Sequence, residues 1–442
     1  MLNHSSLALL LSKQRGAATL LVAVLLLASV LVLSLASYKG VFFQAKRAQN
    51  EIEARIAHWI GEGGLECAYT KMYQDRDQSV LVSGTIYFDS DCVVPMNLSS
   101  MNIDSLGGQK YRIEPEFEQS GILISPVSKV VDFSRNRSTG AIKATADLYI
   151  RGTGTFNPPD PGNELASGWE CVGLRYKNNF EMIGAIDNKQ FYAATNYPSA
   201  SFNPNGKQCL SSHVTTSSAN LKRDFQYDDK LDPFQEAFDL SSSLWTEVRD
   251  NPIYDFDIIQ TSSLIVGNAS VNPASKCGEA VKNKIESGST RIWVEGSCEL
   301  YNDPVVTQPQ WLSEIAAATQ DTDGVLLLVH NGIFSIHGSG EFKGSLFHIN
   351  NSFSPTASDW NGLYGESVKN QLSSYFPSVP TSADVAYVQN GSFVFTGGQS
   401  LDLDGQIAYF NNGLDFKYNS DVLDSIFGVL PPRWLKGSWN DF

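Results

Sequence analysis

The chain has 442 residues, of which 42% are hydrophobic and 18% are charged. This balance excludes a wholly disordered chain, and the length exceeds what one hydrophobic core usually serves. The net charge is −15, yet residues 1–60 carry +4 from six basic and two acidic side chains, which leaves −19 for the remainder. An acidic body argues against nucleic acid as the main partner, and a basic N-terminal segment suits attachment to a membrane by one end.

The N-terminal region contains an uncharged run from Gly16 to Tyr38. As a helix this run spans roughly 35 Å, enough to cross the hydrocarbon core of a bilayer. It is longer than the apolar region of an ordinary cleaved signal peptide, and a helical pattern continues beyond it. That pattern places apolar side chains at spacings of three and four residues, on Ala45, Ala48, Ile52, Ile56 and Trp59. We therefore expect one helix over residues 17–73, loosened at Gly40, Gly61, Gly63 and Gly64.

The start of this helix carries a distinctive junction. The run Lys13-Gln14-Arg15-Gly16, followed by Ala17-Ala18-Thr19-Leu20-Leu21, resembles the leader junction of type IV pilin-like proteins, in particular the PilX N-terminal family of pilus assembly proteins. The segment Gly61–Ala68 is similar to the one that closes that family's helix. The resemblance covers residues 12–70, under a fifth of the chain.

The resemblance implies that a prepilin peptidase cuts after Gly16 and methylates the new N-terminal amine of Ala17, with Lys13 and Arg15 as the basic leader residues. Residues 1–16 are then a leader, and residues 17–75 are the anchor and amphipathic helix. Major pilins carry a glutamate at the fifth mature position, where this chain has Leu21. PilX-type proteins and tip pseudopilins share its absence, which puts ordinary packing inside a fibre in doubt.

Six cysteines lie at or beyond the end of the expected helix: Cys67, Cys92, Cys171, Cys209, Cys277 and Cys298. An even number outside the membrane of an exported protein predicts disulfides, although six cysteines allow fifteen pairings. We expect pairing in sequence order, Cys67–Cys92, Cys171–Cys209 and Cys277–Cys298. The rival interpretation is a metal site, for which Cys209 and His213 form a close couple. No second couple completes such a site, so we expect no metal.

The remaining chain divides by composition. Residues 76–151 predict a pilin-like β module with strands over 79–88, 110–117 and 144–151. Residues 152–165 are rich in Gly and Pro and predict a linker. Residues 166–284 are polar and receive no fold. Residues 285–442 predict a β-rich domain with a short helix over 311–319.

The β-rich domain shows a weak repeat. Asn331–Ile336 and Asn390–Phe395 share a register, and each continues into a Gly-led strand, at Gly344 and Gly405. Arg291–Leu300 looks like another repeat unit. Such strands predict a β-solenoid, with a β-sandwich as the alternative. The predicted fold class is therefore α+β: a long transmembrane and amphipathic helix with a pilin-like module, then a β-rich C-terminal domain.

The motifs of common enzymes are missing from the sequence. No Walker loop, GxSxG, HExxH or dinucleotide-binding glycine motif occurs, so we expect no catalytic residues and no cofactor. His330, His337 and His348 are expected to be ordinary surface or core residues. The acidic runs at 321–324 and 402–405 are expected to be turns, because neither has the ligand that a calcium loop needs at its twelfth position.

Together these features predict a non-enzymatic, minor, terminal subunit or assembly factor of a type IV pilus or related secretion fibre, with a role in adhesion. Its expected partners are other pilin or pseudopilin subunits, the prepilin peptidase and the inner membrane. We expect a single-pass inner-membrane protein with a periplasmic body that later reaches the pilus or cell surface. The alternative is a membrane-anchored β-helix surface protein that binds or acts on glycans.

Overall fold

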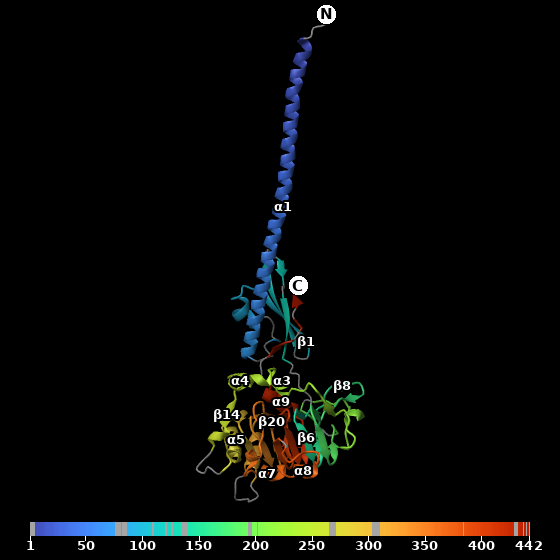
Figure 1. Ribbon diagram of the computed structural model, residues 1–442, viewed down its shortest axis with the longest axis vertical. Coiled ribbons are helices and arrows are strands. Elements are labelled where there is room, and N and C mark those ends of the chain that lie inside the picture. Colours follow the sequence, from blue (N-terminus) through green and yellow to red (C-terminus); the bar gives the residue numbers. More distant parts are fainter. Residues whose placement is uncertain are drawn as a thin grey trace. The chain divides into compact units, whose positions relative to one another are not determined.

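The computed structural model describes residues 5–75, 81, 86–107, 110–119, 122–124, 127–133, 140–192, 197–200, 202–264, 271–302, 310–382, 384–427, 432–435, 437–438 and 440–441. The chain forms two compact units, visible in Figure 1. Unit 1 comprises Met1–Arg135 and Pro431–Phe442, and unit 2 comprises Asn136–Leu430. Unit 2 is therefore an insertion in the chain of unit 1.

Unit 1 begins with α1 (Ser5–Asp75), which is one continuous helix (Figure 1). The expected long helix is confirmed, but it does not loosen at its glycines. Gly64 instead allows close packing: a Cβ there would lie 2.8 Å from Leu98 Cδ1 and 3.3 Å from Pro115 Cβ. A glycine in this position costs helix propensity and gains approach to the neighbouring sheet.

The C-terminal part of α1 packs on an antiparallel sheet. Its order is β1 (Ser100–Gly107), β2 (Lys110–Gln119), β4 (Val127–Asp132) and β26 (Arg433–Trp434), with β3 (Ile122–Ile124) on β2 and β27 (Asn440–Asp441) on β4. The predicted strand over 110–117 is confirmed within β2. The last strands of the chain thus return to complete this sheet, and Trp434 stacks on Tyr69 of α1.

The predicted strand over 79–88 is wrong where the structure describes it. Ile86–Phe88 is a helical turn, α2, and it runs into a π-helical turn, η2 (Asp89–Val93). Phe88 and Cys92 are four residues apart and both are buried in the core of unit 1. That spacing places two side chains on one side of a helix, whereas in a strand residues two apart share a face. Residues 79–80 and 82–85 lie outside the described part of the chain.

Unit 2 is built from parallel sheets. The long sheet has the order β13 (Phe225–Tyr227), β10 (Leu174–Tyr176), β5 (Ile142–Ala144), β23 (Gln399–Asp402), β20 (Gly344–Ile349), β17 (Val325–His330), β15 (Arg291–Glu295), β14 (Asp257–Gln260). The second sheet has the order β11 (Phe180–Ile183), β6 (Asp147–Arg151), β24 (Ile407–Asn411), β21 (Val385–Asn390), β18 (Phe334–His337), β16 (Cys298–Tyr301). A third side contains β12 (Ile186–Asn188), β7 (Gly154–Phe156) and β25 (Leu414–Phe416), and the pair β19 (Gly340–Phe342) and β22 (Phe393–Phe395).

Consecutive strands form rungs, and a complete rung gives one strand to the long sheet, one to the second sheet and one to the third side. The rung β5–β6–β7 is followed along the chain by β10–β11–β12, and the rung β20–β21–β22 is followed by β23–β24–β25. The pairing between rungs in these sheets is parallel, unlike the antiparallel pairing of a β-sandwich. Only the small hairpin of β8 (Glu164–Leu165) and β9 (Gly168–Trp169) is an antiparallel strand pair among the described strands of this unit.

The order of the rungs in space differs from their order in the chain. The chain enters at β5–β6–β7, continues to β13 at one end of the long sheet, and then crosses to β14 at the other end. It winds back until β23, β24 and β25 pair with β5, β6 and β7. The last rung is therefore hydrogen-bonded to the first.

The interior between the sheets is apolar. The pairing of the last rung with the first, called the closure below, places buried apolar side chains in this interior. Leu401 is the register partner of Ala144, Phe410 is the partner of Ile150, and all four are buried. On the third side Phe156 stacks on Phe416 with a centroid distance of 4.8 Å. Burying such side chains contributes roughly 1.5–3 kcal/mol each.

Helices cover the rungs. Those in unit 2 are α3 (Pro233–Phe238), α4 (Trp245–Arg249), α5 (Cys277–Glu286), α6 (Trp311–Gln320), α7 (Tyr364–Lys369), α8 (Leu372–Tyr375) and α9 (Ser420–Phe427), with short 3₁₀ turns η4–η8 at Ser211–His213, Ser242–Leu244, Thr261–Ser263, Pro273–Lys276 and Ala357–Trp360. The predicted short helix is confirmed as α6. Aromatic residues of α3 pack against Phe347 on the outer side of the long sheet, and Val281 of α5 and Ile315 of α6 reach the interior core.

The units divide the chain differently from the composition. Residues 144–151 were expected in the pilin-like module, but they supply the last residue of β5 and all of β6 in unit 2. The expected linker contains β7, which begins at Gly154 and whose Phe156 is buried in the interior core, so this stretch is built into unit 2. The polar region 166–284 supplies a further rung, both end strands of the long sheet and the crossing between them.

The repeat has a different meaning in the structure. Phe334 of the first copy starts β18 on the second sheet, whereas Phe393 of the second copy starts β22 on the third side. The two similar segments therefore occupy neighbouring sides of the stack, and they are not the same side of successive rungs. Arg291–Leu300 does contain two strands of a rung, β15 and most of β16.

Polar residues just after β23 form hydrogen bonds across the closure. Asp402 accepts a hydrogen bond from Thr145 Oγ1 at 3.1 Å, and Asp404 accepts from Lys177 Nζ at 3.1 Å and Asn178 Nδ2 at 2.8 Å. Burial, with the charge of Asp232, raises the pKa of Asp402 to about 6. Although burial opposes it, hydrogen bonds from Asn178 and Lys177 lower the pKa of Asp404.

These opposite shifts predict opposite effects of two isosteric substitutions. Because the pKa of Asp402 is raised in the folded state, ionisation of this carboxyl lowers the stability of unit 2 as the pH rises from about 4 to about 6. Asp402→Asn cannot ionise, so it should stabilise unit 2 by about 1–2 kcal/mol at pH 7.5 and have little effect at pH 4. Asp404→Asn removes an ion pair and should destabilise at pH 7.5. Denaturant unfolding of both variants at the two pH values measures this, and effects of the same sign at pH 7.5 would contradict it.

Candidate functional site

The N-terminal half of α1 is the first candidate functional element. The span Ala17–Gln74 contains a window with no buried residue that is apolar enough to cross a membrane. Among the described helices α1 alone has this property. Gly16 and Ala17 both lie within the helix, and Leu21 is exposed on it. The predicted roles of the Lys13 and Arg15 side chains fall outside the described residues.

The second half of α1 has a different apolar face from the one expected. Ile52, Ile56 and Trp59 are all more than half exposed, with Trp59 at 72%. The helix instead buries a face that begins at Ala57 and includes Leu65. The apolar residues expected on one face do lie along the helix, but no other part of the described chain packs on Ile52, Ile56 or Trp59 enough to bury them.

The six cysteines form three disulfides: Cys67–Cys92, Cys171–Cys209 and Cys277–Cys298. These are the pairs expected from sequence order. The first fastens α1 to η2 in unit 1, and the third joins the start of α5 to the start of β16 in unit 2. Cys209 is thereby excluded as a metal ligand beside His213.

The other histidines serve separate polar contacts. His330 lies between Glu295 and Asn351, with both contacts at 3.1 Å, and His348 Nε2 lies 2.9 Å from the carbonyl of Gly332. His337 Nε2 lies 2.9 Å from Ser335 Oγ. Burial lowers the pKa of His337 and of His348 to about 4, so both are neutral at pH 7. Within the described ranges no group of three His, Cys, Asp or Glu residues is arranged to hold a metal.

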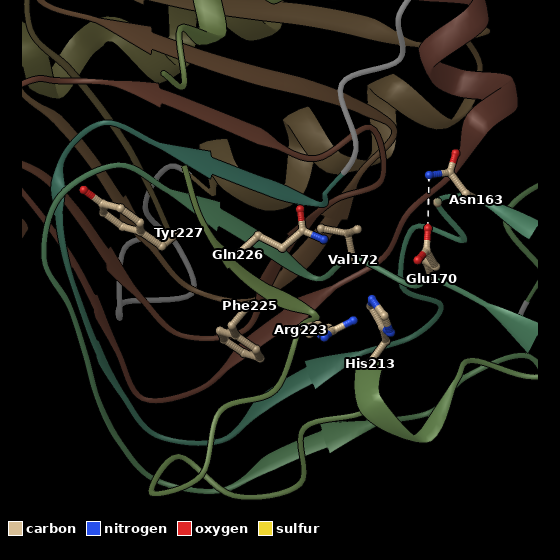
Figure 2. Close-up of a pocket in the computed structure, with 9 residues that line it drawn as sticks. Asn163, Glu170, Val172, His213, Arg223, Phe225, Gln226 and Tyr227 are labelled. Atoms are coloured by element: carbon tan, nitrogen blue, oxygen red, sulfur yellow. Dashed lines mark hydrogen bonds between the residues drawn. The ribbon is translucent and has the colours of Figure 1, made fainter. Parts of the chain in front are cut away.

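A pocket of about 470 Å³ lies at the β13 end of unit 2 (Figure 2). Asn163, Glu170, His213, Arg223, Gln226 and Tyr227 are among the residues that line it. Val172 and Phe225 add an apolar wall. The volume lies within the range of small-molecule sites in proteins, and polar groups of several types converge on it.

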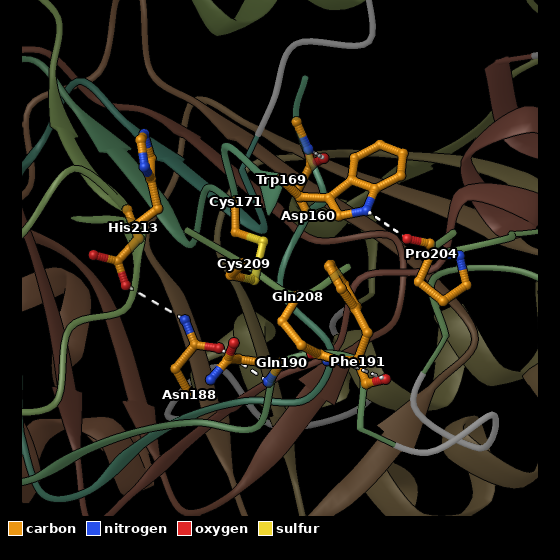
Figure 3. The surroundings of a disulfide bond; sticks show 12 residues. Asp160, Trp169, Cys171, Asn188, Gln190, Phe191, Pro204, Gln208, Cys209 and His213 are labelled. Carbon is orange, nitrogen blue, oxygen red and sulfur yellow. Dashed lines mark hydrogen bonds between the residues drawn. A yellow bond between two sulfur atoms is a disulfide. The ribbon is translucent and has the colours of Figure 1, made fainter. Parts of the chain in front are cut away.

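The second disulfide positions two walls of this pocket (Figure 3). Cys171 follows Glu170 directly, and Cys209 precedes η4, which carries His213. Trp169 Nε1 donates to the carbonyl of Pro204 at 3.2 Å on the same side. The bridge therefore fixes the distance between the Glu170 wall and the His213 wall.

Two buried carboxylates position the remaining walls. Asp224 accepts hydrogen bonds from Thr215 N at 2.8 Å and from Asn188 Nδ2 at 3.4 Å, so its neighbours Arg223 and Phe225 have a fixed place. Asp160 accepts from Gly162 N at 2.9 Å and from Gly140 N at 2.8 Å. This second contact holds the turn that leads to Asn163.

The titratable side chains of the pocket differ in their contacts within the chain. Arg223 is exposed and forms no ion pair with any residue that the structure describes. His213 is only 4% exposed; one ring nitrogen, Nδ1, lies 3.0 Å from Ser212 Oγ, and burial lowers the pKa of this imidazole. Glu170 Oε2 accepts from Asn163 Nδ2 at 3.2 Å.

Sequence reasoning did not find this pocket. It singled out His213 only for its spacing from Cys209, and it gave no fold to residues 166–284, which supply most of the walls. A usable signal was the position of Cys171 beside Glu170 and of Cys209 near His213, because a disulfide brings the neighbours of its cysteines together. Comparison of the chain with family models, curated proteins and solved structures gives no match.

The burial of the three disulfides predicts an order of reduction. Access of the attacking thiolate limits thiol–disulfide exchange. Cys277 and Cys298 are both 0% exposed, whereas Cys67 is partly exposed. Each bridge closes a loop of 21 to 38 residues and should stabilise by about 3 kcal/mol.

We expect alkylation of native protein to label no cysteine, and graded reduction to expose Cys67 and Cys92 before Cys277 and Cys298. Differential alkylation followed by peptide mass spectrometry measures the order. Labelling of the interior pair first would contradict the assignment of burial, and labelling without reductant would contradict the pairing itself.

Proposed function

We propose that this chain is a minor, terminal subunit or assembly factor of a type IV pilus or related secretion fibre. It is synthesised with a leader that ends at Gly16 and is held in the inner membrane by α1, with both units in the periplasm before assembly. Other pilin or pseudopilin subunits are its partners. The role is structural and extends to adhesion through unit 2.

The observation that carries the proposal is the continuity of α1. One helix joins an uncharged, wholly exposed membrane-spanning half to a half that is built into the core of a disulfide-bonded helix-and-sheet unit. A cleaved signal peptide has no reason to continue in this way into the folded body. The leader junction at Lys13–Ala17 and the similarity to the PilX N-terminal family supply the rest of the argument.

Leu21 and the size of unit 2 support a terminal position. A subunit inside a fibre would place a neighbour's N-terminal amine against Leu21, and an amine left without its carboxylate partner costs roughly 3–5 kcal/mol. Unit 2 alone spans Asn136–Leu430, a large body to repeat along a thin fibre. A subunit at the end of the fibre avoids both penalties.

We also infer that unit 2 is a β-solenoid. Its rungs repeat parallel strands on three sides around one apolar interior, which is the construction of such folds. A rigid body of this kind is suited to present a binding surface away from the membrane.

Processing of the leader tests the proposal. The protein sheared from cells with the fibres should begin at Ala17, with a methylated amine, by mass spectrometry. Gly16→Leu should leave the uncut precursor in the inner membrane, whereas the matched leader variant Ser12→Ala should be processed normally.

Two outcomes would contradict it. An intact Met1 in the membrane-assembled protein would exclude processing at Gly16. Dense immunogold labelling along the fibre, in place of labelling at one end or at the assembly site, would exclude a terminal position.

A further inference from the structure

We infer that the pocket at the β13 end of unit 2 is a groove for an extended peptide segment of a partner chain, which adds a parallel strand to the free edge of β13. The segment carries apolar side chains at alternate positions, because one of its faces covers the apolar interior at this end. This inference does not depend on the proposed role in a fibre, since it concerns unit 2 alone.

The backbone of β13 has one paired edge and one free edge. On the paired edge, Asp224 O accepts a hydrogen bond from β10 at 3.0 Å, and Asp228 N donates one to β10 at 2.9 Å. Backbone groups alternate in direction along a strand, so Phe225 and Tyr227 direct theirs away from β10. Among the described residues, the carbonyl of Phe225 and the N–H and carbonyl of Tyr227 have no hydrogen-bond partner. Such an edge is a template for pairing with another chain.

The pocket lies along this free edge. All three residues of β13, Phe225–Tyr227, line it. Figure 2 shows Tyr227 toward one end of the pocket, and Glu170 with Asn163 toward the other. The pocket is therefore elongated and continues past the start of the strand, which suits an extended chain better than a compact ligand.

Helices close the apolar interior at the opposite end of unit 2. There α5 and α6 pack on β16, and Val281 of α5 and Ile315 of α6 are buried in the interior core. At the β13 end the core finishes in aromatic rings: Tyr176 packs on Phe180 with a centroid distance of 5.4 Å and on Tyr227 at 5.8 Å. Tyr227 remains 65% exposed after this contact. Stacked repeats need a cap at each end, and an added strand supplies one here.

The direction of the side chains along β13 sets the pattern of the segment. Phe225 points into the interior core, so Gln226 points outward and Tyr227 inward. The long sheet is parallel in its described strands. In a parallel ladder the residue opposite Gln226 donates to the carbonyl of Phe225 and accepts from the N–H of Tyr227. The residues on either side of it face inward, onto the rings of Tyr176 and Tyr227.

Other occupants suit the groove less well. A compact ligand reaches only one end of it, because Tyr227 and Glu170 lie at opposite ends. A divalent cation needs several oxygen ligands, and Glu170 is the one carboxylate among the lining residues. A second copy related by a two-fold axis would pair β13 with β13 in the antiparallel direction, unlike the rest of the sheet.

The binding test uses the full chain in detergent micelles and a fluorescent peptide with the sequence of residues 173–177, Gly-Leu-Arg-Tyr-Lys, blocked at both ends. This is the sequence of β10 with one residue on each side, and β10 already matches β13 in register. Its leucine and tyrosine take the inward positions and its arginine lies opposite Gln226. Fluorescence anisotropy should show saturable binding, and a peptide with serine in place of leucine and tyrosine should bind about tenfold more weakly or less.

Methylation of the peptide backbone tests the ladder. N-methylation of the arginine removes the donor to the carbonyl of Phe225 and should weaken binding about tenfold or more. N-methylation of the tyrosine is the matched control and should change binding little, because this N–H points away from β13. Equal effects of the two methyl groups would overturn strand addition. Equal binding of the serine peptide, or no saturable binding of the unmodified peptide, would overturn the inference as well.

Two substitutions at one position locate the site. Tyr227→Ala removes the ring, whereas Tyr227→Pro removes the ring and the N–H on the free edge, where proline is tolerated. Tyr227→Pro should bind the peptide about tenfold more weakly than Tyr227→Ala, and the two variants should unfold at similar temperatures. A folded Tyr227→Pro variant that binds as Tyr227→Ala does would overturn the assignment to β13. The methylated peptides need no variant, so they decide the question even where the proline lowers the unfolding temperature.

Sedimentation measures self-association on the same edge. The unmodified chain should have the same mass as Tyr227→Pro in the same micelles. A dimer that the proline dissociates would assign the free edge to a second copy, and it would overturn the inference of a partner's segment.

Discussion

The structure depends on one closure: the last rung of unit 2 is hydrogen-bonded to its first. In unit 1, Asp132 at the end of β4 is the register partner of Arg433 at the start of β26, so the chain must leave and return at adjacent points. A stack wound in chain order would separate its ends by about 4.8 Å for every rung. Pairing β23 with β5 instead brings the entry and exit rungs side by side.

The closure requires a long connection between the two ends of the long sheet. The chain must cross from β13 to β14 on the outside of the stack, and it does so through α3 and α4, whose Phe234, Phe238 and Trp245 pack on an aromatic outer face. Arg175 anchors the start of this crossing through ion pairs with Asp228 and Glu236. The crossing also leaves β13 as the end strand of the long sheet, which is where the pocket forms.

Much of the local structure could be predicted from the sequence, because local signals dictate it. The apolar run and its helical continuation define α1, and neighbouring cysteines in the chain form the three disulfides. The boundary of unit 2 could not be predicted, since nothing local in residues 142–156 says that they pair with residues 399–416. The repeat could be seen in the sequence, but neighbouring sides of one rung resemble each other as closely as the same side of two rungs. The repeat therefore could not assign strands to sheets. The helix over 86–93 was missed because β-branched and aromatic residues outweighed the four-residue spacing of Phe88 and Cys92.

An engineered disulfide tests the closure most directly. Thr155 of β7 is the register partner of Asp415 of β25 on one side and of Asp187 of β12 on the other. Neighbouring strands lie about 4.8 Å apart, which a disulfide can bridge. Strands separated by one intervening strand are too far apart for a disulfide. Thr155→Cys with Asp415→Cys should therefore form a new bridge in the oxidised protein, found by peptide mapping, and the control Asp187→Cys with Asp415→Cys should not. Free thiols at both positions of the first pair would contradict the closure on which this account rests.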